Sequence, residues 1–594
     1  MARRTLVLGQ LPPQRPATPQ ATAQAATRLI PAGVWCVVGR EGEYPGWEQA
    51  FAFPPDPFDP ATSADAAAVL DAAAREAKAL AASCLPRLAA RLRPESALPA
   101  AYWDVALAPW LIMATQLVVG YQHRLRALIA AYGGEELDVP LLPEDMPLGF
   151  TNEQAFIFHG SLGAAFTHWL LSTLLRAQWP AAWRAVEMPA PAGELCPPPG
   201  NAPGRTRDPG ARLRQLGQRL LMTLPFPRVR GFGLRQSLLL SRALWANRNS
   251  ADASRSLAEA ARDWGPVPAL PLDPVPLLWR CLPLSLKEAR YPSGVRVARR
   301  RRIRVASISA WEDTAYRMQL AAWRAAGHKL VFIQHGGNYG QVRTAAFTPL
   351  LEYVQHAFIT WGWHAQGPER GNFVPLPAPL LEGVCNAHAE RTPTLLYVGT
   401  EISVFPYRMD SRPTPRQYVR YRAAKVEFFA ALPVAVQARC LYRPYFSVPG
   451  TLADAEWLLP RFPALQRCVG PLEPHMLGCR LLVLDHHGTT LLQALAANVP
   501  LVVFWEREAW ALCPECAELL PALRDAGIWH PDARSAAAHV ARVWETVPAW
   551  WCSEPVQAAR RLWRERYALT TDVSPAAQAA GGLDALWART LQAL

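Results

Sequence analysis

The stretch KLVFIQHGGNYG, residues 329–340, decides the fold. Its residues 330–333 form a short apolar run with the β-branched character of a buried parallel strand. The run stops at His335 and two glycines, which permit positive φ and a close backbone approach to a ligand. Because ligands bind at the carboxyl ends of strands in open α/β sheets, His335 is a candidate proton-transfer residue. The alternative is a tight turn whose histidine bonds only to the backbone.

Strands and helices alternate on both sides of this stretch. Strand-like runs at 303–308 and 358–361 flank it, and helical periodicity covers 314–326. After a proline-containing link at 372–392, the alternation restarts with strands at 395–398, 439–442, 480–484 and 501–504 and helices at 414–432 and 489–497. This β-α-β order predicts two α/β halves with parallel sheets and a ligand cleft between them.

The N-terminal third is mainly helical by the same criteria. Strands are expected at 5–9 and 34–39, and helices at 61–92 and at 102–131, the latter broken near Pro109. Asn152 is expected to cap a further helix. The longest uncharged stretch, 105–121, is short for a membrane span, so a buried core helix is expected there. Residues 187–210 are rich in proline and glycine and predict a mobile loop.

Composition narrows the classes of partner. A chain of 594 residues is too long for one core and predicts at least two domains. The net charge of +13 favours an anionic partner, although arginine-rich and lysine-poor usage is also typical of GC-rich codon bias. No base-stacking aromatics interleave with the basic run at 297–304, so nucleic acid is not expected as a partner.

Cysteine usage and the N-terminus indicate the compartment. The eleven cysteines are scattered, and the one CxxC pair, Cys513 and Cys516, has no second pair or histidine pair beside it. Reduced cytoplasmic thiols are therefore expected, with a zinc site as the alternative. No secretion signal is visible at the N-terminus, which agrees with a cytoplasmic location.

A second strand-turn-helix unit lies in RLLVLDHHGTTLLQALAANVPLVVF, residues 480–504. The strand ends at Asp485, and a helix opens at Thr489 and Thr490. The N–H groups and dipole at a helix N-terminus form an anion site, so the two hydroxyls are expected to cap the helix or to hold a diphosphate.

Three further residues follow strands of the same half. Gly399 and Thr400 end the strand at 395–398, and Arg443 ends the strand at 439–442. All three are expected to face the same crevice as the 485–490 turn. Arg443 suits bidentate recognition of a phosphate.

Together these motifs resemble a known family. QHGGNYG, LLEYVQHAFITWGW, DHHGTTLLQALAANVPLVVFW and EREAWAL with LRDAGIWH resemble the transferases of O-antigen and other surface-carbohydrate gene regions. That family is distantly similar to the capsule and teichoic-acid glycosyl- and glycerophosphotransferases of GT-B fold. The resemblance is clearest over residues 301–567 and extends weakly to YWDVALAPWL near the N-terminus.

The resemblance implies an α/β, GT-B-like fold with two Rossmann-like domains facing a cleft and a helix-rich N-terminal part. Residues 1–375 are expected on the acceptor side, and residues 391–594 on the nucleotide-donor side. His335 matches a histidine that acts as general base. The implied donor site consists of Gly399, Thr400, Arg443, Asp485, His487, Gly488, Thr489, Thr490 and Gln493. The expected acceptor site consists of Gly336, Gly337, Tyr339 and Trp361, with stacking of the two rings on a sugar weighed against a core role.

Two positions depart from the family pattern. His487 stands where proline is expected before the glycine, and Gln493 stands where many GT-B enzymes carry a glutamate that binds the ribose. An amide still hydrogen-bonds a hydroxyl but is neutral. The departure at Gln493 therefore leaves the nucleotide preference open.

The leading hypothesis is a glycosyltransferase that uses a nucleotide-activated sugar as co-substrate and no further cofactor. No DxD-type motif stands beside a predicted catalytic turn, so metal independence is expected. The acceptor would be a carbohydrate or lipid-linked carbohydrate, and the place of action the cytoplasm or the inner membrane surface. One alternative is transfer of a phospho-alcohol from a CDP-linked donor. The other is a non-catalytic polysaccharide-assembly protein with a decayed transferase site.

Overall fold

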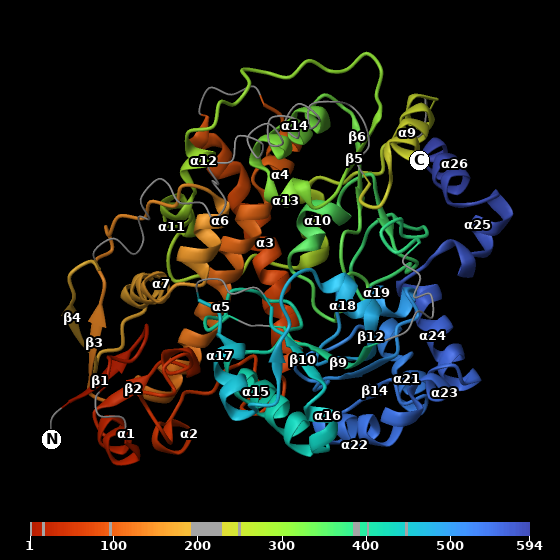
Figure 1. Cartoon of the computed structure of the whole chain (residues 1–594). Coiled ribbons are helices and arrows are strands. Elements are labelled where there is room, and N and C mark those ends of the chain that lie inside the picture. Colours follow the sequence, from red (N-terminus) through yellow and green to blue (C-terminus); the bar gives the residue numbers. More distant parts are fainter. Residues whose placement is uncertain are drawn as a thin grey trace, which may run out of the picture.

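The computed structural model describes residues 3–14, 18–93, 98–191, 229–246, 251–383, 392–400, 403–445 and 450–594 (Figure 1). Most of the predicted loop at 187–210 and part of the predicted link at 372–392 lie outside these residues. Within them the named strands form three sheets, and every pairing between those strands is parallel.

The three sheets follow one another along the chain. The N-terminal sheet has the order β2-β1-β3-β4, with β1 (Arg4–Val7), β2 (Leu29–Pro31), β3 (Leu137–Leu141) and β4 (Arg184–Glu187). The central sheet has the order β5-β6-β7-β8, with β5 (Ile303–Ala306), β6 (Lys329–Ile333), β7 (Ala357–Thr360) and β8 (Phe373–Pro375). The C-terminal sheet has the order β11-β10-β9-β12-β13-β14, with β9 (Thr392–Val398), β10 (Cys440–Arg443), β11 (Gln466–Arg467), β12 (Cys479–Leu484), β13 (Leu501–Phe504) and β14 (Trp529–His530).

These sheets confirm the predicted α/β, GT-B-like class. The apolar run of β6 is buried at every position, because helices and loops cover both faces of a parallel sheet. The strand expected at 34–39 is wrong: residues Val34–Cys36 form the 3-10 helix η1, and β2 lies just before it. The indole N–H of Trp35 donates to the carbonyl of Leu8 at 3.1 Å, so this segment packs side chains against the end of β1 instead of pairing its backbone.

Helices make up most of the N-terminal part, as predicted. They are α1 (Pro19–Ala26), α2 (Trp47–Ala50), α3 (Ala66–Leu92), α4 (Ala100–Ala106), α5 (Ala108–Tyr132), α6 (Glu153–Ala155), η2 (Phe156–Ser161), α7 (Ala164–Arg176), α9 (Leu234–Ala246), α10 (Leu257–Trp264), α11 (Pro274–Cys281) and α12 (Leu284–Lys287). Asn152 caps α6 by accepting the N–H of Ala155 at 2.8 Å, as expected.

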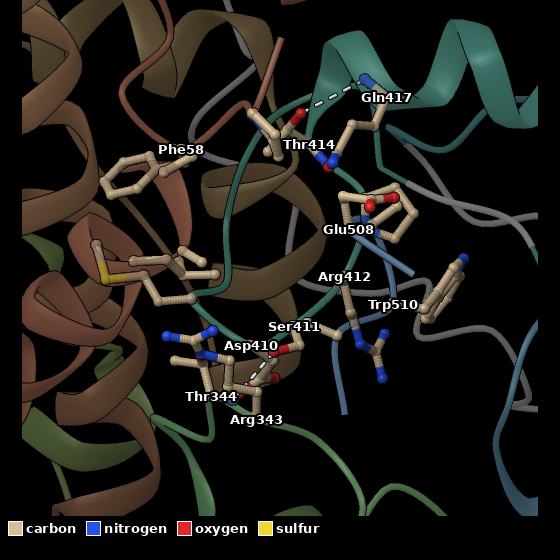
Figure 2. Close-up of a pocket in the computed structure, with 18 of the residues that line it drawn as sticks. Phe58, Arg343, Thr344, Asp410, Ser411, Arg412, Thr414, Gln417, Glu508 and Trp510 are labelled. Atoms are coloured by element: carbon tan, nitrogen blue, oxygen red, sulfur yellow. Dashed lines mark hydrogen bonds between the residues drawn. The ribbon is translucent and has the colours of Figure 1, made fainter. Parts of the chain in front are cut away.

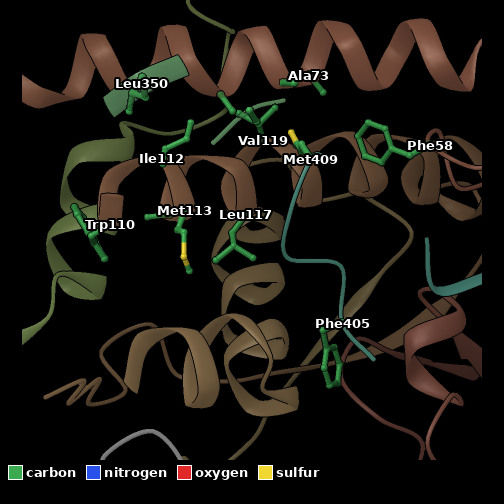
Figure 3. Close-up of a cluster of buried hydrophobic side chains, with 14 of the residues drawn as sticks. Phe58, Ala73, Trp110, Ile112, Met113, Leu117, Val119, Leu350, Phe405 and Met409 are labelled. Atoms are coloured by element: carbon green, nitrogen blue, oxygen red, sulfur yellow. The ribbon is translucent and has the colours of Figure 1, made fainter. Parts of the chain in front are cut away.

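The long apolar region forms two helices, α4 and α5, which break just before Pro109. Every residue from Ala108 to Gln122 is buried, and Figure 3 shows Ile112 and Val119 pointing from α5 toward α3. No single described helix is long and apolar enough to cross a membrane; α4 and α5 reach that composition only together and are bent by 68°.

Helices of the central and C-terminal parts cover the other two sheets. They are α13 (Ser309–Glu312), α14 (Thr314–Ala325), η3 (Pro349–Tyr353), α15 (Pro415–Ala431), α16 (Val434–Gln437), α17 (Asp454–Leu458), η4 (Leu459–Arg461), α18 (Leu472–Gly478), α19 (Thr489–Ala496), α20 (Pro514–Ala517), α21 (Leu520–Asp525), α22 (Ala533–Val543), η5 (Trp544–Thr546), α23 (Val547–Trp551), α24 (Glu554–Tyr567), η6 (Thr571–Val573), α25 (Pro575–Ala580) and α26 (Leu583–Ala593).

The C-terminal helix α26 returns to the central sheet. Trp587 is buried in one cluster with Ile303, Val331 and Ile359 of that sheet. Its indole N–H donates to the carbonyl of Pro377 at 3.0 Å. The last helix therefore ties the end of the chain to a sheet that precedes the C-terminal sheet in sequence, as Figure 1 shows.

We expect Trp587→Ala to lower the free energy of unfolding by about 3–5 kcal/mol, because it removes a large buried ring and leaves a cavity. Trp245→Ala is the matched control. Its ring is 63% exposed and contacts the Arg302 guanidinium, so the loss should stay within about 1 kcal/mol. Urea unfolding followed by circular dichroism measures both, and equal stabilities would contradict the packing of α26.

Candidate functional site

The turn after β6 is held by the side chain of Gln334. Its amide N–H donates to the carbonyl of Gly336 at 2.8 Å, and its oxygen accepts the N–H of Trp361 at 2.9 Å and the indole N–H of Trp363 at 2.8 Å. A buried amide that uses both donor and acceptor fixes the backbone around it. The position of His335 is therefore set by the residue that precedes it.

This turn touches the turn after β12 directly. The N–H of Gly337 donates to the Thr489 hydroxyl at 2.8 Å, and a Cβ at Gly337 would lie 2.3 Å from the Gly488 carbonyl carbon. Asn338, with a φ of 72°, accepts a hydrogen bond from His487 Nδ1 at 2.9 Å. The two strand-end turns predicted to flank a cleft thus meet backbone to backbone.

His335 lies beside the Tyr339 hydroxyl and the buried Glu352 carboxyl. The side chain of His335 is 17% exposed, and its ring nitrogens lie 3.1 Å from the Tyr339 hydroxyl. The Glu352 carboxyl, on η3, is fully buried and lies 3.8 Å from His335 Nδ1. Burial lowers the pKa of His335 to about 4, with a further decrease from the charge of Arg230. The imidazole is therefore neutral at pH 7, the form that accepts a proton.

Glu352 is a functional candidate that the sequence analysis missed. Its Oε1 accepts the indole N–H of Trp311 at 2.8 Å, while its Oε2 is buried without a hydrogen-bond partner among the described residues. Burial raises the pKa of Glu352 to about 8. The available signal was a lone carboxylate inside the apolar run LLEYV.

The expected acceptor aromatics are not available to a ligand in this structure. Trp361 is 2% exposed, and its carbonyl accepts the N–H of Leu569 at 3.0 Å. Tyr339 is 9% exposed and stacks on Phe358 with ring centroids 5.4 Å apart. The stacking hypothesis for these two rings is therefore corrected to a core role, because both pack into the apolar layer beside β7.

Asp485 lies in a buried charge network below the donor-side turn. Its Oδ2 accepts the Tyr397 hydroxyl at 3.0 Å and lies 3.7 Å from Lys425 Nζ, which also pairs with Asp454. Burial alone would raise the pKa of Asp485, but the charge of Lys425 and the bond from His486 lower it below its ordinary value. Asp485 therefore stays ionised inside the protein.

The network also explains the two residues that end β9. A Cβ at Gly399 would lie 3.0 Å from Lys425 Nζ, so the close approach of the charged groups favours glycine. The backbone of Thr400 is held on both sides by the Tyr421 hydroxyl, which accepts its N–H at 3.0 Å and donates to its carbonyl at 2.7 Å. Gly399 thus lies beside Asp485, and Thr400 is fixed by Tyr421.

The other expected donor-side residues lie on α19 and at the end of β10. The expectation that Thr489 and Thr490 cap α19 is wrong, because the N-cap is Gly488, with a φ of 154°, and no side chain caps it. Gln493 is half-buried on the same helix. Arg443 donates to the carbonyl of Cys468 at 3.4 Å, toward the sheet edge formed by β11.

A cavity of about 590 Å³ is lined by Trp505 and Trp510, whose rings contact His487, although no residue of the 485–490 turn lines it. Figure 2 shows Phe58 and Arg343 on one side of it and Glu508 and Trp510 on the other. We call it the arginine cavity, because its lining contains Arg124, Arg343, Arg408, Arg412 and Arg507 against the carboxylates of Asp410 and Glu508. The ring of Trp510 also contacts His487, at 5.4 Å between centroids.

Two of these arginines have no carboxylate to neutralise them. Arg124 pairs with Asp56, Arg343 with Asp71 and Arg408 with Asp410. In the part of the chain that the structure describes, Arg412 and Arg507 have no such pair. Burial lowers the pKa of His487 to about 3, and the charge of Arg412 adds to this effect. The available signal for Arg412 was a charged loop after a strand end, at residues 408–412.

The described residues contain no group of three or more histidine, cysteine or acidic side chains arranged to hold a metal ion. Cys513 and Cys516 are buried thiols, and Cys513 donates to the carbonyl of Gly340 at 3.0 Å. Burial raises the pKa of the Cys513 thiol to about 12.

Two parallel sheets meet at the carboxyl ends of their strands, with a neutral histidine at the junction and an arginine-lined cavity near it, and define an α/β protein of the GT-B-like class. The chain belongs to the LIC12162 family of transferases, whose model matches residues 15–578. No curated protein matches the chain. A mutant O-GlcNAc transferase of Thermobaculum terrenum aligns over 97% of this chain and 99% of its own, with 12% identity and a TM-score of 0.28. A likeness at that TM-score bears on neither fold nor activity.

The contact between the two turns predicts a strong difference between neighbouring glycines. Gly337→Ala should cost about 1–3 kcal/mol, because the new Cβ would meet backbone atoms of the opposite turn. Gly336→Ala is the matched control, since its Cβ would lie 3.1 Å from the rotatable Thr489 hydroxyl and should cost less. Urea unfolding compares the two variants; equal losses would show that the turns do not pack as described.

The buried Glu352 predicts a pH-dependent stability. Its folded pKa of about 8 lies above the ordinary value of 4.5, so its contribution to stability is lost as the pH rises through this window. Glu352→Gln cannot titrate and should gain stability relative to wild type between about pH 5 and about pH 8. Glu545→Gln is the control, because Glu545 is exposed. Urea unfolding at both pH values tests this, and a constant difference would argue against a buried protonated carboxyl.

Proposed function

We propose that this transferase moves a glycosyl group from a nucleotide-activated sugar to a carbohydrate or lipid-linked carbohydrate acceptor. The observation that carries the proposal is the direct contact of the His335 turn with the 485–490 turn beside the arginine cavity. A donor bound on one side of this junction and an acceptor on the other would place both at strand ends, where α/β folds bind ligands.

His335 is the proposed general base. It is neutral at pH 7, partly exposed and at a strand end, which are the properties needed to accept the proton of an acceptor hydroxyl. The imidazolium formed in that step would lie 3.8 Å from the Glu352 carboxyl, which holds its own proton at pH 7 and would fix the position of the ring. Glu352 therefore acts on His335 and not on the substrate.

The arginine cavity is the proposed site of the nucleotide diphosphate. Arg412 and Arg507 supply charge-assisted hydrogen-bond donors, and Trp510 supplies an aromatic face. The turn of His487, Gly488, Thr489 and Thr490 and the residues Gly399, Thr400, Arg443, Asp485 and Gln493 remain the proposed frame of this site. Arginine charge stabilises the leaving phosphate, so the proposed reaction includes no metal ion and no cofactor besides the co-substrate.

The resemblance of the motifs supports a role in bacterial surface polysaccharides, such as the O-antigen of lipopolysaccharide or a capsule. We place this reaction in the cytoplasm, where nucleotide sugars are made, with peripheral contact to the inner membrane. The basic composition supports that contact, because arginines near an anionic leaflet contribute about 1 kcal/mol each.

Two other functions use the same site. Transfer of a phospho-alcohol from a CDP-linked donor would need the same base and the same arginines, but it breaks the bond between the two phosphates. It therefore releases CMP, whereas glycosyl transfer releases a nucleoside diphosphate. A non-catalytic assembly protein would release neither. Analysis of the nucleotide product separates the three functions.

The experiment that tests the proposal compares His335→Ala with Arg412→Ala and Arg443→Ala. A thermal-shift screen of UDP-, GDP-, dTDP- and CDP-linked donors first identifies the donor, since ligand binding stabilises the fold by mass action. His335→Ala should then lower kcat by about 10²–10⁴-fold and leave nucleotide affinity within about twofold. Each arginine variant should weaken nucleotide binding by about tenfold or more, as expected for a lost charge-assisted bond.

Arg524→Ala is the control, because Arg524 is exposed on α21 outside the cavity. A folded His335→Ala variant with wild-type turnover would show that the base lies elsewhere. If Arg412→Ala binds the donor as tightly as wild type, the arginine cavity is not the donor site.

A further inference from the structure

A second cavity, of about 760 Å³, shares no lining residue with the arginine cavity. It is bounded by α5, by the residues around α6 and η2, and by α13 and α14. Trp110, Phe156, Trp311 and Phe347 contribute aromatic surface to it. We call it the Trp311 cavity.

Trp311 and Phe347 are partly exposed aromatic side chains of this cavity, whereas Trp110 and Phe156 are buried like Trp361. Trp311 and Phe347 are half-buried and lie at 4.6 Å between ring centroids with an interplanar angle of 31°. The exposed polar side chains of Gln154, Glu312 and Gln319 lie around them. Aromatic faces beside amide and carboxylate groups suit a molecule with one apolar C–H face and several hydroxyls.

The Trp311 cavity and the arginine cavity differ in the charge of their lining residues. No lysine or arginine is among the lining residues of the Trp311 cavity, which include the carboxylates of Glu312 and Asp313 and that of Glu153, the last paired with the buried Arg317 behind the wall. A phosphate or other anion would find no cation to pair with and would face repulsion from the carboxylates. An alkyl chain would bury these polar groups without hydrogen bonds, which is costly. The chemistry therefore favours a neutral polyhydroxylated ring.

The Trp311 cavity adjoins both parts of the site described above. The indole N–H of Trp311 donates to Glu352 at 2.8 Å, and Glu352 lies 3.8 Å from His335. Phe347 contacts Trp311 and also lies 4.7 Å from the guanidinium of Arg408, which lines the arginine cavity. One aromatic side chain thus separates the two cavities, and one carboxyl separates the Trp311 ring from His335.

We propose that the Trp311 cavity binds the neutral carbohydrate part of the acceptor, with a sugar ring stacked on Trp311 and Phe347. This inference rests on the proposed glycosyl transfer and adds the place and the chemical class of the acceptor. The acceptor then enters from the side of α5 and α14, while the donor occupies the arginine cavity beyond Phe347.

The test measures binding of a panel of probes: the methyl glycosides of glucose, galactose, mannose, rhamnose and N-acetylglucosamine. Saturation-transfer NMR on the full chain detects which glycoside binds, and titration gives its affinity. Trp311→Ala and Phe347→Leu should each weaken it by about fivefold to tenfold, as expected when stacking is lost. Trp245→Ala, which removes an exposed indole elsewhere, should bind as wild type does.

Trp311→Phe separates stacking from the hydrogen bond to Glu352. It keeps an aromatic ring but removes the indole donor, so glycoside affinity should stay within about twofold. Circular dichroism and the unfolding midpoint establish that each variant is folded. If Trp311→Ala does not fold, Phe347→Leu and Trp311→Phe still decide the question.

Three results would overturn the inference. The first is that none of the glycosides binds wild type at tens of millimolar, and the second is that binding is unchanged in Phe347→Leu. The third is that an octyl phosphate probe competes with the glycoside in the cavity, which would assign it to a lipid chain or an anion. Nucleotide binding is measured in parallel: if it persists while glycoside binding fails, only the acceptor site is wrong, whereas loss of both would remove the proposed function.

Discussion

The contact between Gly337 and the Gly488–Thr489 backbone is the constraint on which the site depends. The two turns approach so closely that a single Cβ at Gly337 would overlap backbone atoms of the other sheet's turn. On both sides of this contact, burial lowers the pKa values of the histidines. The same packing therefore joins the two sheets and keeps His335 and His487 neutral. Loss of the contact would affect stability and acid–base behaviour together.

Burial shifts the pKa values of His335 and Glu352, which lie next to each other, in opposite directions. It raises the pKa of the Glu352 carboxyl and lowers the pKa of the His335 imidazole, so at pH 7 the carboxyl holds the proton and neither group is charged. An uncharged pair avoids the large cost of two buried ions. The neutral imidazole therefore lies 3.8 Å from a carboxyl that holds its own proton.

The sequence was most informative where periodicity and buried strands coincide. The strands β6, β12 and β13 and the helix α19 lie within one residue of their predicted bounds, because each is a short apolar run between turn residues. The strand prediction at 34–39 was wrong because the apolar side chains of Val34–Cys36 pack around Trp35, and the backbone there does not pair as a strand. The local sequence pattern does not show whether an apolar run pairs as a strand or only packs its side chains.

The site was only partly predictable for a related reason. His335, Asp485 and Gly399 follow strand ends, and position after a strand is visible in sequence. Glu352, Arg412 and Trp311 act through contacts made across the fold, with separations of 17 to 77 residues from His335, and the local sequence around each does not show which distant groups it contacts. Trp361 is the opposite case: its position at a strand end made it a candidate ligand-binding residue, but an aromatic side chain there is equally compatible with the core position that it occupies.

The two cavities differ in the chemistry of their lining residues. Positive charge without carboxylate partners is concentrated on the side of α15 and the 505–512 loop, whereas aromatic surface with carboxylates is concentrated between α5 and α14. Phe347 lies at the boundary, with Arg408 and Trp311 as its neighbours. His335 lines neither cavity: it lies 3.8 Å from Glu352, which accepts the Trp311 indole N–H, and its turn is fixed by the contact of Gly337 with Thr489. The link from His335 to the Trp311 cavity therefore passes through a single buried carboxyl.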